Sequence, residues 1–148
     1  MKPIRKSTLA ILCAAVVMQS SCGGPKPSTG VPEPPLVTAA RVSDEEAHTL
    51  YQLSNLVGDL NRQGLLSKEK THKVDLLLLK AARDTKTFNT NARLFTTFDA
   101  TNKKALFDLG KQIANTIAQI AGISTDPNYV SLYNLAVATI NTILALTQ

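Results

Sequence analysis

Apolar residues recur every three or four positions through most of the chain after residue 43, a spacing typical of amphipathic helices. Four such stretches are separated by short segments that contain glycine, proline or helix-capping residues. The alternation of apolar and polar residues that indicates strands is hard to find. The pattern therefore predicts an all-α domain over residues 39–148, built as a small four-helix bundle of antiparallel helical hairpins.

The first predicted helix begins at Ser43, where "SDEE" has the form of a capping box with Glu46. Gly64 is expected to end this helix in a left-handed conformation, with Leu65 as its hydrophobic contact. Ser67 is expected to cap the second helix, and so short a connection makes the two helices antiparallel. The apolar stripe of the first helix consists of Ala47, Leu50, Leu53, Val57 and Leu60.

The second predicted helix is long and carries a seam of residues at alternating spacings of four and three. Leu76, Leu77 and Leu79 lie beside the seam, which predicts contact with more than one neighbour. Residues 84–98 are rich in Thr and Asn, so their helix propensity is low and they should form the weakest part of the domain. The seam consists of Val74, Leu78, Ala81, Thr85, Phe88, Ala92 and Phe95.

A third helix is predicted to begin at Asp99 or Thr101 and to end near Gly122. The alternative is one continuous bent helix through residues 99–102. The apolar stripe of this third segment consists of Leu106, Leu109, Ile113, Ile117 and Ile120.

The fourth predicted helix begins with Asp126 as its N-cap and Pro127 at its first position. No charged side chain occurs from Asn128 to Gln148. The segment 129–147 could span about 28 Å at 1.5 Å per residue, so a membrane-spanning helix is the alternative to a bundle helix that touches two neighbours. Internal asparagines and the lack of flanking basic residues and Trp favour the bundle. Its two apolar stripes are Val130, Tyr133, Val137, Ile140 and Leu144, and Leu132, Leu135, Ile143 and Leu146.

The N-terminal segment has basic residues at its start, an apolar stretch at 8–18 that is too short to span a bilayer, and then "QSSC" ending at Cys22. This segment resembles a bacterial lipoprotein signal peptide over residues 1–22. The resemblance implies cleavage before Cys22 and acylation of its thiol, with palmitate as one of the acyl groups. The implied domains are a signal peptide at 1–21, the lipidated Cys22 with a flexible Pro- and Gly-rich linker at 22–38, and the bundle at 39–148. An uncleaved anchor and an ordinary secreted protein are the alternatives.

The formal net charge of +5 changes little in this interpretation. Lys2, Arg5 and Lys6 belong to the signal segment, and without them 13 basic residues face 11 acidic ones. We therefore expect no nucleic-acid partner. The basic residues between 68 and 93 are interpreted as a solvated helix face, with contact to an anionic surface such as lipid headgroups as the alternative.

No motif for catalysis, phosphate binding or metal binding is recognisable in the sequence. His48 and His72, the only histidines, are interpreted as exposed surface residues. We therefore expect no enzyme activity, catalytic residue, metal, cofactor or small-molecule ligand. Tyr51, Tyr129 and Tyr133 are expected to be half-buried with hydroxyls that reach water, or to line a groove between the first and fourth helices.

Together these features predict an exported protein held by lipid on the periplasmic face of an outer membrane or the extracellular face of a cell membrane. Its domain is expected to be a non-catalytic binding or scaffolding module whose partner is another envelope protein. The alternative is a membrane-acting protein whose C-terminal helix, 129–147, inserts into a bilayer or pairs with a membrane protein, as in a phage-type exclusion lipoprotein.

Overall fold

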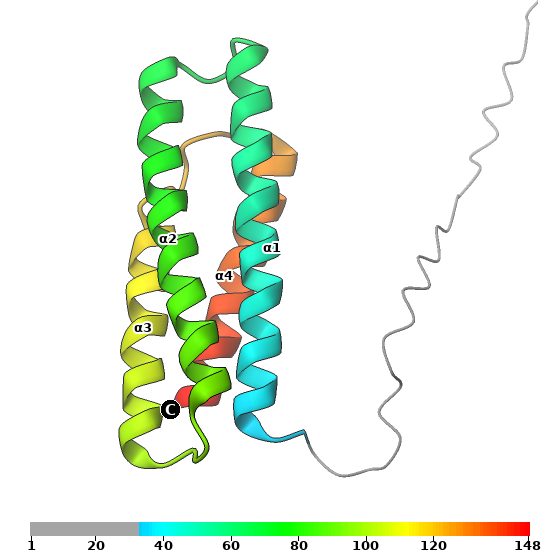
Figure 1. The fold of residues 1–148 in the computed structure, drawn as a ribbon. Coiled ribbons are helices and arrows are strands. Elements are labelled where there is room, and N and C mark those ends of the chain that lie inside the picture. Colours follow the sequence, from blue (N-terminus) through cyan, green and yellow to red (C-terminus); the bar gives the residue numbers. More distant parts are fainter. Residues whose placement is uncertain (1–32) are drawn as a thin grey trace, which may run out of the picture. The chain divides into compact units, whose positions relative to one another are not determined.

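The structure, a computed structural model, describes residues 33–148, and most of these form four helices (Figure 1). The helices are α1 (Pro35–Arg62), α2 (Lys68–Leu94), α3 (Ala100–Ala118) and α4 (Pro127–Thr147). Contacts join α1 to α2, α2 to α3, α3 to α4 and α4 to α1, so that α2 and α4 lie at opposite corners of a ring. The prediction of an all-α four-helix bundle is confirmed. The predicted signal peptide and most of the predicted linker lie outside the described residues.

The first helix begins at Pro35 and not at Ser43, so the predicted capping box is wrong. Ser43 lies inside the helix, where its Oγ donates to the carbonyl of Ala40 at 2.7 Å, and Glu46 is fully buried. The helix starts earlier because proline is favoured at a first helical position and because the apolar spacing continues upstream. The upstream residues that reach the core are Ala39, Ala40 and Val42.

The turn between α1 and α2 follows the predicted chemistry with one exception. Gly64 has a φ of 73°, a left-handed conformation that glycine adopts without steric cost. The hydrophobic contact after it is made by Leu66, which is 4% exposed, and not by Leu65, which is 65% exposed. Ser67 caps α2, because its Oγ accepts a hydrogen bond from the backbone N–H of Lys70 at 3.3 Å.

The predicted seam of α2 faces the core along its whole length, and only Phe95, which follows the last helical residue, is less than fully buried. The expectation that the neighbouring leucines contact further helices is wrong for Leu76 and Leu79, which are exposed. The continuous-helix alternative is also wrong, because an irregular segment separates Leu94 from Ala100. Asp99 is the N-cap of α3 and accepts a hydrogen bond from the N–H of Asn102, which lowers the pKa of its carboxyl.

The last helix packs against α1 and α3 and has an inner and an outer side. Asp126 caps it by accepting from the N–H groups of Asn128 and Tyr129, with Pro127 at its first position, as predicted. Gly110 allows close packing on α3, since a Cβ there would lie 3.1 Å from a methyl carbon of Leu144. The buried residues of α4 are Tyr129, Ala136, Thr139, Ile140, Ile143 and Thr147.

Candidate binding surfaces

The residues singled out for chemistry do not converge in the structure. Cys22, the predicted lipidation site, lies outside the described residues. His48 and His72 are exposed on different helices, as predicted, and the ring of His48 lies 3.0 Å from the side-chain nitrogen of Gln52. Between residues 33 and 148 no three His, Cys, Asp or Glu side chains are arranged to hold a metal ion.

The three tyrosines occupy three different environments, so the predicted shared groove does not exist. Tyr129 is buried, and its hydroxyl donates to the carbonyl of Ile120 at 2.7 Å and not to water. Burial, with a smaller contribution from Tyr133, raises the pKa of Tyr129 to about 12. Tyr133 is half-buried, whereas Tyr51 is 65% exposed and lies beside Leu79 at the boundary of α1 and α2.

Sequence reasoning missed a buried carboxyl group at Glu46. This residue has no exposed surface, and neither of its carboxyl oxygens has a hydrogen-bond partner; the same is true of Oγ1 of Thr85. Burial raises the pKa of Glu46 to about 8, so the side chain is mostly neutral at pH 7. The signal was available, because Glu46 continues the apolar stripe one turn before Leu50, but the capping-box interpretation concealed it.

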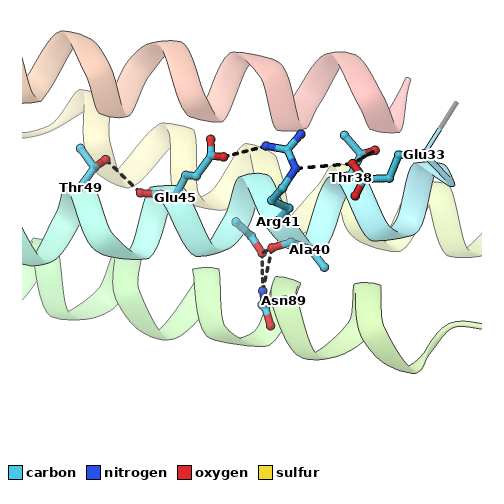
Figure 2. Close-up of polar contacts among 8 residues, drawn as sticks. Glu33, Thr38, Ala40, Arg41, Glu45, Thr49 and Asn89 are labelled. Carbon is cyan, nitrogen blue, oxygen red and sulfur yellow. Dashed lines mark hydrogen bonds and ion pairs between the residues drawn. The ribbon is translucent and has the colours of Figure 1, made fainter. Parts of the chain in front are cut away.

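Polar contacts fix the register of α1 against α2 (Figure 2). Asn89 of α2 donates to the carbonyl of Ala40 at 2.9 Å and to Oγ of Ser43 at 2.7 Å. An ion pair of 2.6 Å joins Arg93 to Asp44 nearby. These contacts place the beginning of α1 beside the end of α2.

The outer side of α4 carries no charge although it faces solvent. We call this surface the α4 outer face, and its apolar members include Val130 at 42% and Leu135 at 50% exposure. A groove of about 600 Å³ lies between this face and α1, bordered by Leu135 and Thr139 on one side and His48 and neighbouring polar residues on the other. The α4 outer face comprises Val130, Ser131, Asn134, Leu135, Ala138, Asn141, Thr142 and Ala145.

The outer side of α2 is rich in charge. Lys80 pairs with Asp84 at 2.8 Å, and Arg93 pairs with Asp44. Other cations of α2 are exposed and make no ion pair with another described residue, namely Lys68, Lys70, Lys73, Arg83 and Lys86. The predicted solvated basic face is therefore present on this helix.

No protein-family model, no curated protein and no solved structure matches the chain. Among the described helices, α4 alone is long and apolar enough to cross a membrane, a property that core helices of water-soluble proteins share. The functional argument therefore depends on the surfaces of the bundle itself.

Proposed function

We propose that this chain is a lipid-anchored envelope protein whose helical bundle binds another envelope protein through the α4 outer face. One observation carries this proposal: a helix on the surface of the bundle exposes a side with no charged residue. The centres of protein interfaces are depleted of charged residues, because burying an unpaired charge is costly. The α4 outer face has this composition.

The residues of this face also have the chemistry that a protein partner requires. Val130 and Leu135 offer apolar side chains, while Asn134 and Asn141 offer amide donors and acceptors. An apolar surface with interspersed hydrogen-bonding groups is typical of protein–protein contact. The charged outer side of α2 is the contrast within the same molecule, since it has the composition of a surface that stays in water.

Attachment to the membrane is proposed from the sequence around Cys22 and its resemblance to lipoprotein signal peptides. A bilayer anchor would concentrate the bundle near its envelope partner, which raises the effective concentration for binding. The test is expression of the full chain and its Cys22→Ser variant in a bacterial host with radiolabelled palmitate. The wild-type chain should be labelled and shortened, whereas normal processing of the variant would refute the anchor.

Binding through α4 is tested by placing a photoreactive amino acid at single surface positions in the membrane-attached chain. Position 134 lies on the α4 outer face, and Thr87 provides a matched exposed position on α2. We expect a discrete cross-linked protein from position 134 and none from position 87. The cross-link should disappear when Leu135→Glu is added. Equal cross-linking from both positions would contradict the proposed surface.

A second candidate function is that α4 itself enters the bilayer, and the apolar character of this helix favours it. Mean hydropathy reaches 1.5 in its most apolar window, and much of the helix is not covered by the bundle. Insertion would require α4 to leave α1 and α3, which would expose to water the core surface that those helices share with it. Protection of Leu135→Cys from a membrane-impermeant maleimide, relieved only by detergent, would favour insertion.

A further inference from the structure

The end of the bundle at which α1 begins has a different surface from the opposite end. The start of α1, the end of α2, the 95–99 connection, the start of α3 and the end of α4 all lie there (Figure 1). The α1–α2 turn with Gly64 and Leu65 lies at the opposite end. We call the first of these the tether end, because α1, the first described helix, begins there.

Apolar side chains at the tether end are exposed. Leu94, the last residue of α2, is 71% exposed, the highest value among the large apolar residues of the described region. Val37 in the first turn of α1 is 51% exposed. Behind them Phe95 and Phe98 are half-buried and pack on the core. This end therefore has exposed apolar side chains together with aromatic side chains that pack on the core.

A lysine lies over an aromatic ring at this end. The Nζ of Lys103, in the first turn of α3, lies 5.4 Å from the ring centre of Phe98. The acidic groups nearby are paired with cations of the same end or cap a helix: Asp108 pairs with Lys104, Glu33 and Glu45 pair with Arg41, Asp44 pairs with Arg93, and Asp99 caps α3. Apolar tips beside lysines with long aliphatic stems are typical of surfaces that lie at the boundary between lipid headgroups and acyl chains.

The length of the segment between Cys22 and Pro35 favours the bilayer as the binding partner of this surface. Twelve residues, 23–34, separate Cys22 from Pro35, and even fully extended they reach only about 40 Å. The 28 residues of α1 alone extend about 42 Å. A lipid on Cys22 therefore keeps the tether end within about 40 Å of the bilayer in every orientation of the bundle, a limit that does not apply to the end with Leu65.

We propose that the tether end docks on the bilayer surface, with Leu94 and Val37 entering the boundary of the acyl chains and Lys103 lying among the lipid headgroups. This proposal rests on the lipid anchor proposed above. If the bundle docks at this end, its helix axes stand at a steep angle to the membrane plane. The α4 outer face then remains accessible to a partner protein beside the bundle.

The experiment uses the absence of Trp from the chain. Leu94→Trp and the matched control Leu65→Trp each add one fluorophore at a leucine of similar exposure, at opposite ends of the bundle. Each acylated full-length variant is reconstituted in vesicles of phosphatidylethanolamine and phosphatidylglycerol, with and without bromine on the acyl chains. We expect the fluorophore at position 94 to be blue-shifted and quenched several-fold by the brominated lipid, and the one at position 65 to remain water-exposed and unquenched.

The outcomes separate docking from anchoring. Mass spectrometry reports whether Cys22 is acylated, and the Cys22→Ser form of each variant is mixed with the same vesicles. Docking is supported if brominated lipid quenches the fluorophore at position 94 and Val37→Ser weakens this quenching. The same result with the unacylated Cys22→Ser form supports docking without the anchor. Equal exposure of positions 94 and 65 in the acylated protein overturns docking and leaves the anchor intact. Unchanged thermal melting shows that each variant is folded.

Discussion

The helices α2 and α4 lie at opposite corners of the same ring, and different features of their sequences determine which side of each helix is buried. Seven basic and three acidic residues lie on α2, and its buried seam is clearly separated from them. No charge occurs on α4, and its exposed side differs from its buried side by uncharged polar residues such as Asn134 and Asn141. Charge helps the apolar seam to orient α2, because a charged side chain is costly to bury. Packing must orient α4, and its exposed side is then free of the charges that would oppose a binding partner.

The largest expected effect comes from truncation of the buried side of each helix. Phe88→Ala in α2 and Ile143→Ala in α4 should lower the free energy of unfolding by about 3–5 and about 2–5 kcal/mol respectively, since both side chains are fully buried. Urea denaturation of the full chain measures this loss. The matched exposed variants, Leu76→Ala and Leu135→Ala, should change stability by less than about 0.5 kcal/mol. An Ile143→Ala variant as stable as the wild type would show that α4 does not belong to the core.

A pH effect is expected from Glu46 of α1, the helix that packs against both α2 and α4. Its pKa rises from 4.5 in the unfolded chain to about 8 in the fold, so between these values the folded state holds more protons. The stability of the fold is therefore unaffected by Glu46 ionisation below pH 4.5 and decreases as the pH rises towards 8, at up to about 1.4 kcal/mol per pH unit.

Urea denaturation at several pH values between 5 and 8 measures this slope. No other acidic or basic residue is buried in the described region, so Glu46→Met should flatten the pH dependence and stabilise the fold at pH 8. Glu46→Gln is the polar control and should flatten the profile as well. A wild-type slope that persists in both variants would exclude Glu46 as its source.

Loss of the N-caps should cost about 1 kcal/mol for each helix. Ser67→Ala removes one hydrogen bond at the start of α2, and Asp126→Ala removes two at the start of α4. We expect the larger decrease in melting temperature for Asp126→Ala. A larger effect at Ser67 would indicate that helix α4 is held by packing with little contribution from its cap.

The smallest effect on stability is expected for charges placed on the two outer sides. Ala138→Glu on α4 and Thr87→Glu on α2 should each change the free energy of unfolding by less than about 0.5 kcal/mol, because both positions are exposed. Their effects on partner binding should differ: Ala138→Glu should abolish the cross-link from position 134, and Thr87→Glu should leave it unchanged. Loss of the cross-link in both variants would contradict a specific role for α4.

Local signals in the sequence were sufficient for the helix count and for most helix ends. The capping residues bond or bend the backbone within one turn of their own position, so their role could be predicted without knowledge of the neighbouring helices. These residues are Gly64, Ser67, Asp99 and Asp126. The start of α1 was missed because a local capping pattern at Ser43 competed with packing that extends upstream. Packing across the bundle decides which side of an uncharged helix is buried, so the exposure of Val130 and Leu135 was not predictable from spacing.

The central claim is that α4 covers the bundle core with one side and presents the other to water. The direct test uses two variants of the acylated chain on detergent-free vesicles, Leu135→Cys and Ile143→Cys. Each variant is treated with a membrane-impermeant maleimide, and peptide mass spectrometry measures the labelling of the cysteine. Leu135 is 50% exposed and Ile143 is fully buried, so position 135 should react without denaturant and position 143 only in urea. Protection of both positions in vesicles, relieved by detergent, would contradict the claim and place α4 in lipid.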